Sequence, residues 1–551
     1  MTIQNKQPKM NNIISVDEYH QRSKHSLQKY AQGPDGLDWD TQPDPFRRFD
    51  GCSRFALPLP AKNLIVDFND IYHQQRIKPA IFDQNTLGAL FQLSLGLSAW
   101  KVYGADRWAL RINPSSGNLH PTEAYLLFSG TNIIPAGVYH YQSHEHSLEQ
   151  RCNLKAHTDA LTSQLGSGCF LIGISSIHWR EAWKYGERAY RYCQHDVGHA
   201  IAAIRYAAAV LGWRAELLEH YGDQHIATLL GLNHQDSFRH AETETPDLML
   251  LINTSSSKAD LPDMDRLIEI IEQVEWKGQA NCLSPDNRIH WDVIEKISAT
   301  CEKPQTEPQH WLPPEYPMLS QCDTDFDASS VIRQRRSAQA FDARSVLPLT
   351  DFYRILDSLL PRADTAPFDA LKWQPRIHLV LFVHRVEGLK PGLYALPRSK
   401  PGEGLLKHNL REQFDWSRPP ICPESLPLFH LVSANSQNAA RTLSCHQAIA
   451  SDGAFNVSML AEFQGEISNK PWQYKQLFWE AGLVGQSLYL EAEAISLRGT
   501  GIGCYFDEAV HETLGINNNA LQVVYHFTVG TPVQDSRLIS LPPYGHLNTG
   551  N

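Results

Sequence analysis

The chain has 551 residues, 42% of them apolar and 20% charged, and a formal net charge of −11. This length exceeds one ordinary hydrophobic core, so two globular domains are expected. The acidic balance argues against a nucleic-acid partner, because no long Lys/Arg stripe would offset the phosphates. No apolar run approaches the roughly 18 residues that span a membrane, and residues 1–16 lack a signal-peptide core. Ten cysteines without a CxxC pair favour a reducing cytoplasm over a disulfide framework.

The composition divides the chain into four segments. Residues 1–60 are polar and turn-rich and are expected to wrap the surface of the rest. Residues 61–254 and 326–551 form two units. The connector between them, 255–325, is rich in Ser, Asp, Glu and Pro and is predicted to contain a helix over 264–276.

The two units align along a long predicted helix, at 190–213 in the first and 474–497 in the second. Tyr190, Arg191, Asp196, Gly198, Ala208 and Arg214 fall on Tyr474, Lys475, Glu480, Gly482, Ala492 and Arg498, at one gap-free offset of 284 residues. Predicted strands repeat at 125–128 and 380–382, at 137–139 and 392–394, and at 248–253 and 523–529. The sequence therefore predicts an α+β fold of tandem domains, each a central sheet flanked by helices, forming an intramolecular pseudo-dimer.

Each unit carries features that the other lacks. The turn Pro114-Ser115-Ser116-Gly117-Asn118 has no hydroxyl-rich counterpart at the aligned positions 369–376. The motif Arg335-Arg336-Ser337 aligns only with Arg76-Ile77-Lys78. The run Gly499-Thr500-Gly501-Ile502-Gly503 aligns with residues 215–219, which contain no glycine. Glycine permits positive φ and close approach, so this run is expected to form a loop whose N–H groups close on a flat or anionic ligand. These complementary losses predict one composite site at the interface of the two units.

The same motifs resemble those of nitroreductase-fold flavoproteins. Arg335-Arg336-Ser337-Ala338-Gln339 resembles their Arg-x-Ser-x-Arg flavin-phosphate motif, with Gln339 in place of the second arginine. Residues 114–118 resemble the Pro-Ser-Ser segment that one protomer lends to its partner's flavin, and 529–532 followed by Arg537 resembles the carboxy-terminal strand and phosphate contact. Lys184-Tyr185-Gly186 is similar to the Lys-Tyr motif of SagB-type azoline dehydrogenases. The resemblance spans 15–250 and 325–545.

The resemblance implies one flavin mononucleotide (FMN) per chain. The phosphate dianion of FMN suits guanidinium forks and a hydroxyl donor, and its isoalloxazine plane needs backbone donors and small neighbours. The residues expected to bind FMN are Arg335, Arg336, Ser337, Gln339, Pro114, Ser115, Ser116, Asn118, Gly499, Thr500, Gly501, Ile502, Gly503 and Arg537.

Lys184 and Tyr185 are the expected catalytic pair. A lysine ammonium beside a phenol favours the phenolate, which would lower the tyrosine pKa from about 10 and allow proton abstraction from an azoline ring. The alternative is a pair without a catalytic role, an amphipathic pair at the start of a helix with Tyr185 half-buried and Lys184 in solvent.

Three other groups invite weaker interpretations. His195 and His199 stand at i, i+4, but no third ligand has fitting spacing, so no metal site is expected. Cys445-His446 suggests a nucleophile, yet adjacent side chains point in different directions, so a structural or substrate-lining role is preferred. Cys504 follows the glycine run and is either a packing residue or close to the flavin.

The expected function is an FMN-dependent dehydrogenase of an azoline or similar ring on a peptide or carrier-bound intermediate. Biosynthetic enzymes would be its partners, with no membrane partner. The alternatives are an NAD(P)H-dependent nitroreductase or quinone-type flavin reductase and a non-catalytic scaffold. The sequence identifies neither the substrate nor the electron acceptor.

Overall fold

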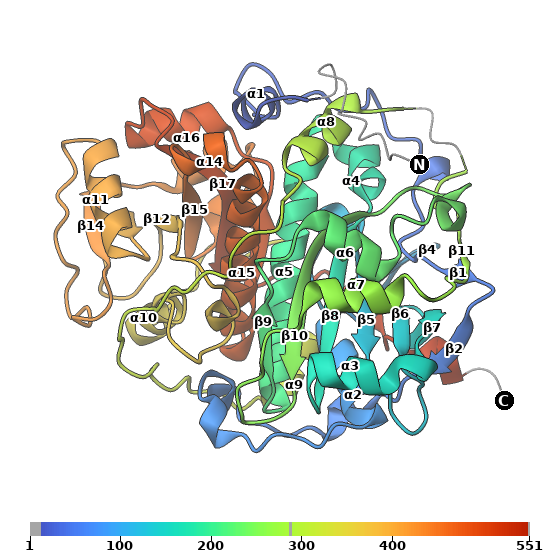
Figure 1. Ribbon diagram of the computed structural model, residues 1–551. Coiled ribbons are helices and arrows are strands. Elements are labelled where there is room, and N and C mark those ends of the chain that lie inside the picture. Colours follow the sequence, from blue (N-terminus) through green and yellow to red (C-terminus); the bar gives the residue numbers. More distant parts are fainter. Residues whose placement is uncertain (1–12, 286–288, 549–551) are drawn as a thin grey trace.

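The computed structural model describes residues 13–285 and 289–548 and contains two large antiparallel sheets (Figure 1). The first has the strand order β2-β7-β6-β5-β8-β10-β9 and the second β14-β13-β12-β15-β17-β16. The strands of the first sheet are β2 (Ser53–Ala56), β5 (Thr122–Phe128), β6 (Gly137–Gln142), β7 (Ser147–Asn153), β8 (Cys169–Ser176), β9 (Arg214–Leu217) and β10 (Thr245–Asn253). Those of the second are β12 (Ile377–Val383), β13 (Gly392–Leu396), β14 (Phe429–Ser433), β15 (Phe455–Glu462), β16 (Arg498–Ile502) and β17 (Leu521–Gly530).

The remaining strands are short pairings at the edges. A three-stranded sheet has the order β18-β3-β4, and β1 pairs with β11. Their bounds are β1 (Phe49–Asp50), β3 (Leu97–Tyr103), β4 (Asp106–Arg111), β11 (Gln279–Ala280) and β18 (Ile539–Leu541). The helices are α1 (Val16–Arg22), α2 (Gln84–Ser94), α3 (Thr158–Leu165), α4 (His178–Tyr185), α5 (Ala189–Val210), α6 (Asp223–Leu230), α7 (Met264–Ile271), α8 (Asp292–Thr300), α9 (Ala328–Gln334), α10 (Leu349–Asp357), α11 (Lys400–Asn409), α12 (Gln437–Leu443), α13 (Ile449–Asp452), α14 (Glu466–Asn469), α15 (Gln473–Ala494) and α16 (Asp507–Leu514).

The strands are apolar on both faces because each sheet is covered on both sides. In β5, Leu126 belongs to the central core and Leu127 to a second core against α3, α6 and α7. In β12, Leu381 faces the central core and Phe382 a third core against α11, α12 and α16. Side chains alternate across a strand, so these continuous apolar runs fill two cores at once.

The long helices α5 and α15 lie side by side between the two sheets (Figure 1). Both are buried along nearly their whole length, which explains why apolar residues occur on all sides of them. The two predicted helices are confirmed, but each ends about three residues early. Gly212 at φ +69° and Ser496 at φ +61° take left-handed conformations that stop a helix.

Two ion pairs link the halves in a reciprocal pattern. Arg191 of α5 binds Asp507, the first residue of α16, at 2.9 Å. Lys475 of α15 binds Asp223, the first residue of α6, at 2.6 Å. In both cases a cation on a long helix reaches a carboxylate at the start of a helix in the other half, and both residues are buried. The two pairs are related by the same 284-residue offset that the sequence shows.

The terminal segments cross between the halves. Tyr19 of α1 is fully buried, and His25 forms a β-bridge with Phe506 of the second half, whereas β2 joins the first sheet. The expectation that the lead segment lies on the rest of the protein therefore holds from residue 13, and residues 1–12 lie outside the described part. At the other end, β18 pairs with β3 of the first half.

The connector is more structured than predicted. Its helix ends at Ile271 rather than 276, and the connector also holds β11 and α8. The buried residues of α8, such as Ile297, belong to the central core. Within residues 13–285 and 289–548, no helix combines the length and apolar character needed to cross a bilayer.

Candidate functional site

A cavity of about 550 Å³ lies between the halves, within the size range of small-molecule sites. It is lined by most of the residues singled out from the sequence: Pro114, Ser115, Ser116, Asn118, Tyr185, Arg335, Arg336, Ser337, Gln339, Thr500, Gly501, Ile502 and Gly503. Because 114–118 and Tyr185 come from the first half and the rest from the second, the site is composite. Lys184, Gly499 and Arg537 do not line it.

One end of the cavity gathers four cations. Lys101 of β3, Arg335, Arg336 and Arg498 all line it. Burial and the charges of Arg335 and Arg498 lower the pKa of Arg336 to about 9, although Glu493, which pairs with Arg498 at 3.7 Å, opposes this shift. One carboxylate beside four cations leaves an excess of positive charge, which is unfavourable without a further anion. The arrangement therefore suits a multiply charged anion.

The guanidinium of Arg335 also has a donor that no described residue satisfies. It is 3% exposed, one Nη donates to the carbonyl of Arg111 at 3.2 Å, and its Nε has no hydrogen-bond partner among the described residues. Arg336 donates to the carbonyls of Arg333 and Ser98, at 2.9 and 2.8 Å. A buried guanidinium with an orphaned donor is costly, and a phosphate oxygen is the kind of partner that would satisfy it.

The serine turn forms the opposite wall. Gly117 and Asn118 have φ of +59° and +61°, a tight turn that glycine and asparagine tolerate. The Ser115 hydroxyl accepts the His120 N–H at 2.7 Å, and Asn118 Nδ2 donates to the carbonyl of Ala109 at 2.9 Å. These bonds fix the turn at the cavity wall, so its small side chains leave room for a flat ligand.

The glycine run is a strand, which corrects the expectation of a loop. Residues 498–502 form β16, the edge strand paired with β17, and Gly499, Gly501 and Gly503 are not among the residues with positive φ. A Cβ on Gly499 would lie 2.5 Å from the ring of Phe527, and one on Gly501 2.8 Å from that of Tyr525. Gly501 N–H donates to the hydroxyl of Tyr489 at 3.0 Å. These glycines therefore make space for aromatic rings beneath the cavity.

Tyr185 ends α4 and places its ring in the cavity. Its ring lies 4.6 Å from that of Tyr192, and a Cβ on Gly117 would meet its Cζ at 3.1 Å. Lys184 Nζ is 5.4 Å from the centre of the Tyr185 ring but points outside the cavity lining. Burial, together with the carboxyl groups of Glu181 and Asp196, raises the pKa of Tyr185 well above 10. The expectation of a lowered tyrosine pKa is therefore wrong.

Arg537 lies away from the other cations. Its guanidinium binds Asp535 at 2.7 Å and its side chain is 69% exposed. The segment that carries it does reach the cavity, through Gln534, Leu538 and Ser540, and Lys101 donates to Ser540 Oγ at 2.6 Å. The C-terminal segment thus contributes to the wall, although the arginine predicted to bind phosphate pairs internally.

The sequence did not single out two buried carboxyl groups at the cavity. Asp196 of α5 is 2% exposed and lines the cavity, and Glu181 of α4 is fully buried behind it. The backbone N–H of Ser116 donates to Asp196 at 3.1 Å, and Ser115 Oγ lies 3.5 Å from Glu181. The one available signal was the match of Asp196 with Glu480 in the repeated helix, which marked an acidic residue inside a buried helix.

The two histidines at i, i+4 are both buried in α5. His195 stacks on Tyr525 at 4.2 Å between ring centres. His199 lines the cavity, and its two ring nitrogens lie 3.2 Å from Gln486 Oε1 and from the Tyr525 hydroxyl. Burial lowers the pKa of His199 to about 3, so the ring is neutral.

Cys445 and Cys504 form a disulfide, with their Cα atoms 5.8 Å apart. The sequence did not predict this bond. Cys504 lines the cavity directly after the glycine strand, and Gln447 from the same loop as Cys445 also lines it. The bond fastens the 444–448 loop to the cavity rim, so Cys445 has a structural role and Cys504 both joins the bond and lines the cavity.

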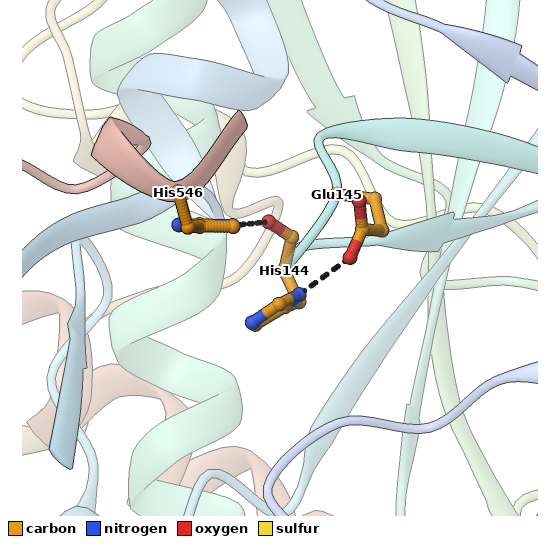
Figure 2. A group of neighbouring side chains, drawn as sticks. All are labelled: His144, Glu145 and His546. Atoms are coloured by element: carbon orange, nitrogen blue, oxygen red, sulfur yellow. Dashed lines mark hydrogen bonds and ion pairs between the residues drawn. The ribbon is translucent and has the colours of Figure 1, made fainter. Parts of the chain in front are cut away.

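Elsewhere, three possible metal ligands lie close together, with ligand atoms within 4.8 Å of one another: His144, Glu145 and His546 (Figure 2). His144 Nδ1 pairs with Glu145 at 2.7 Å, and His546 Nε2 bonds the carbonyl oxygen of His144 at 2.9 Å. The group joins the turn between β6 and β7 to the C-terminal segment. Since its polar atoms already bind one another, we interpret it as a clamp on that segment.

Side chains fill the counterpart positions in the other half. At the repeat offsets, Arg205 stands opposite Tyr489 and Asp369 opposite Pro114. Arg205 binds both oxygens of Asp369 at 2.8 Å, and Lys372 binds Glu216 at 2.9 Å. Among the described residues, the cations at these counterpart positions are therefore paired with carboxylates.

Comparison with known proteins places this site in a recognised fold. Residues 332–531 match the sequence model of the Nitroreductase family. A solved structure from Anabaena variabilis, described as a nitroreductase, is similar over 94% of this chain and 99% of its own, with 22% identity and a TM-score of 0.66. The chain therefore has a nitroreductase-type fold over nearly its whole length.

Other solved structures are more distant. A protein of Ralstonia eutropha described as a nitroreductase shares 16% identity over 42% of this chain and 99% of its own, with a TM-score of 0.27. A chain of the Escherichia coli microcin synthetase McbBCD complex shares 20% identity over 45% of this chain and 89% of its own, with a TM-score of 0.25. At these scores the two likenesses bear on neither fold nor function. No curated protein sequence matches the chain.

Proposed function

We propose that the protein is an FMN-dependent oxidoreductase with one flavin per chain. The observation that carries the proposal is the cluster of Lys101, Arg335, Arg336 and Arg498 in the composite cavity, with an orphaned Arg335 Nε. The dianionic phosphate of FMN would neutralise this cluster. The nitroreductase-type fold and the family match of 332–531 support the same assignment.

We further propose that the chain is a tandem duplication forming an internal pseudo-dimer. The order β7-β6-β5-β8-β10-β9 repeats as β14-β13-β12-β15-β17-β16, and the reciprocal ion pairs Arg191–Asp507 and Lys475–Asp223 follow one offset. In this proposal the two domains are residues 61–254 and 326–551, and residues 255–325 connect them. The salt bridge of Arg205 with Asp369 at the counterpart position supports a single FMN.

When bound, FMN would supply two-electron chemistry as a hydride acceptor or donor. Arg335, Arg336, Ser337 and Lys101 would hold its phosphate, and the serine turn and β16 would enclose its ring. The Tyr185 hydroxyl, protonated because its pKa is raised, would donate a hydrogen bond into the cavity. Lys184 would then act from outside the cavity, as a charge near the Tyr185 ring.

The substrate we propose is an azoline or similar ring on a peptide or carrier-bound intermediate, supplied by biosynthetic partner enzymes. The resemblance of Lys184-Tyr185-Gly186 to the SagB-type motif supports this class, and the placement of Tyr185 in the cavity is compatible with it. Gln339, also in the cavity, would take the place of the second phosphate-binding arginine. The second candidate is an NAD(P)H-dependent flavin reductase, and the third is a non-catalytic scaffold.

The decisive experiment is the spectrum of the purified chain before and after reconstitution with FMN. We expect absorbance at about 450 nm from oxidised flavin and one FMN released per chain. Anaerobic bleaching by a thiazoline-containing peptide, and not by NADPH, would favour the dehydrogenase, and the reverse result would favour the reductase. A chain that binds no FMN would refute the proposed function, and two FMN per chain would refute the single site.

A further inference from the structure

Asp196 and Glu181 form a carboxyl pair without an ion pair to any cation in the described part of the chain, although the charge of Lys184 acts on Glu181. Both are almost fully buried, at 2% and 0% exposure. Among the described residues their hydrogen bonds come from Ser115 and Ser116, and Glu181 Oε2 has no hydrogen-bond partner. Buried carboxylates are normally paired with a cation, as Asp507 is with Arg191. An unpaired pair at a cavity wall therefore needs a proton.

The surroundings of the pair explain where that proton resides. The titratable groups that act on the two carboxyl groups are Tyr185 and Lys184 from α4, Tyr192 and Cys193 from α5, and Tyr525 from β17. Burial and the charge of Asp196 raise the pKa of Glu181 well above its usual value, although Lys184 and the hydrogen bond from Ser115 oppose the shift. Burial raises the pKa of Asp196 to about 7. Both carboxyl groups therefore hold a proton to higher pH than an exposed carboxyl group does.

The position of Asp196 gives the pair access to a ligand. Asp196 lines the cavity, and the turn that binds it through Ser116 also carries Gly117, on which the Tyr185 ring rests. Tyr185 itself resists ionisation, so it is a poor base at neutral pH. Of the two carboxyl groups that line the cavity, Asp535 forms an ion pair with Arg537, whereas Asp196 forms none among the described residues.

We propose that Asp196 is the group that exchanges a proton with the ligand in this cavity, with the neighbouring Glu181 holding a second proton. This inference rests on the proposed function. In a dehydrogenation, one C–H bond gives its hydride, with two electrons, to FMN, and a second C–H bond gives its proton to the Asp196 carboxylate. The substrate gains a double bond, and the Asp196 carboxylic acid returns the proton to solvent after product release.

The titration of the pair can be measured without flavin or substrate. Infrared spectra of the full-length apoprotein in D₂O between pH 5 and 9 should show a carboxylic acid C=O band that disappears around pH 7. Asp196→Asn should abolish this step, because asparagine keeps the shape and loses the ionisable group. Glu181→Gln should retain it, because a neutral residue replaces a neutral acid. Ser116→Ala should move the step to higher pH, because the Ser116 hydroxyl stabilises the Asp196 carboxylate.

Asp247 is the matched control, because it is equally buried but lies outside the cavity lining. It binds Ser176 and Gln194, and burial raises its pKa to about 6. Asp247→Asn should remove a separate step at lower pH and leave the step around pH 7 in place. A step around pH 7 that survives Asp196→Asn would overturn the assignment.

Coupling to the flavin is tested by the reduction potential of bound FMN as a function of pH. Negative charge on reduced flavin would raise the pKa of Asp196, so the slope of potential against pH should change near pH 7 in the wild type and Asp247→Asn, and not in Asp196→Asn. Equal slopes in all three proteins would overturn the role in proton exchange while the proposed function stands. If the chain binds no FMN, the proposed function and this role both fail, and the infrared result shows only a buried titrating pair.

Discussion

Gly198 of α5 and Gly482 of α15 touch where the two long helices cross. A Cβ on Gly482 would lie 2.8 Å from Gly198 Cα and would also overlap the carbonyl oxygen of His195. The two glycines are counterparts at the 284-residue offset, so the crossing point coincides with the centre of the internal repeat. Close backbone approach at this point brings Asp196 of α5 to the composite cavity.

Gly482→Ala should therefore separate the helices and weaken the whole molecule. The atoms that a methyl group would meet are backbone atoms and cannot rotate away, and overpacking of this kind costs about 1–3 kcal/mol. We expect a lower melting temperature and partial loss of FMN. Gly404→Ala on α11 is the control, since a Cβ there meets no atom within 4 Å and alanine favours helix. An unchanged melting temperature for Gly482→Ala would contradict the close crossing.

The ion pairs between the halves predict a specific dependence of stability on pH. Burial alone would raise the pKa of Asp507, but Arg188 and Arg191 outweigh it and lower the pKa to about 2. A carboxylate with a depressed pKa stabilises the fold above its unfolded pKa of about 3.9, and this contribution is lost as the pH falls toward 2. The shift corresponds to roughly 2 kcal/mol.

Asp507→Asn should lower the melting temperature at pH 7, because it leaves Arg188 and Arg191 buried without a carboxylate. The difference in melting temperature between this variant and the wild type should shrink between about pH 4 and pH 2, where the wild-type aspartate becomes protonated and therefore neutral, like asparagine. Thermal melts across this range are the measurement. A difference that stays constant down to pH 2 would show that the shifted carboxylate is not the source of the stability.

The flavin-phosphate assignment predicts different results for two arginines. Arg336→Ala should weaken FMN binding at least tenfold, because a charged hydrogen bond to phosphate contributes roughly 1.5–3 kcal/mol. Arg537→Ala should weaken binding much less, since Arg537 does not line the cavity and its guanidinium is paired with Asp535. Fluorescence titration of the apoprotein with FMN measures both. If Arg537→Ala weakened binding as much as Arg336→Ala, Arg537 would have to turn toward the phosphate on binding.

The sequence predicted the two long helices and their matching residues because these signals are local and spaced along one helix. Gly198 and Gly482, matched by offset alone, are the residues that meet in space. The complementary losses of 114–118 and 335–337 predicted one composite site, and these segments do line one cavity. Each of these inferences needed only a pattern and a count of residues.

The errors concern side chains whose partners are distant in sequence. The glycines at 499 and 501 suggested a loop, whereas Phe527 and Tyr525 explain them from the neighbouring strand. The lowered pKa expected for Tyr185 considered Lys184 alone, and the buried Glu181 and Asp196 reverse its direction. Burial is a property of the assembled fold, so neither the packing around these glycines nor the direction of the Tyr185 pKa shift could be predicted from adjacent residues.

Tyr185→Phe separates chemistry from binding. It removes the hydroxyl and keeps the ring that packs on Tyr192 and Gly117, so the FMN content should match the wild type. If the hydroxyl positions or protonates the ligand, turnover of a thiazoline-containing peptide should fall by ~10²–10⁴-fold. Because the raised pKa keeps the hydroxyl protonated, the pH–rate profile of the wild type should show no titration of Tyr185 below about pH 10.

Lys184→Met is the companion variant, since it removes the charge and keeps the aliphatic stem. With Lys184 outside the cavity lining, we expect a smaller loss of turnover than for Tyr185→Phe and no change in FMN content. Stopped-flow bleaching of the bound flavin measures turnover, and absorbance after release measures FMN. If Tyr185→Phe turned over at the wild-type rate while Lys184→Met did not, the lysine would be the catalytic member of the pair. A Tyr185→Phe protein without FMN would instead assign Tyr185 to cofactor binding.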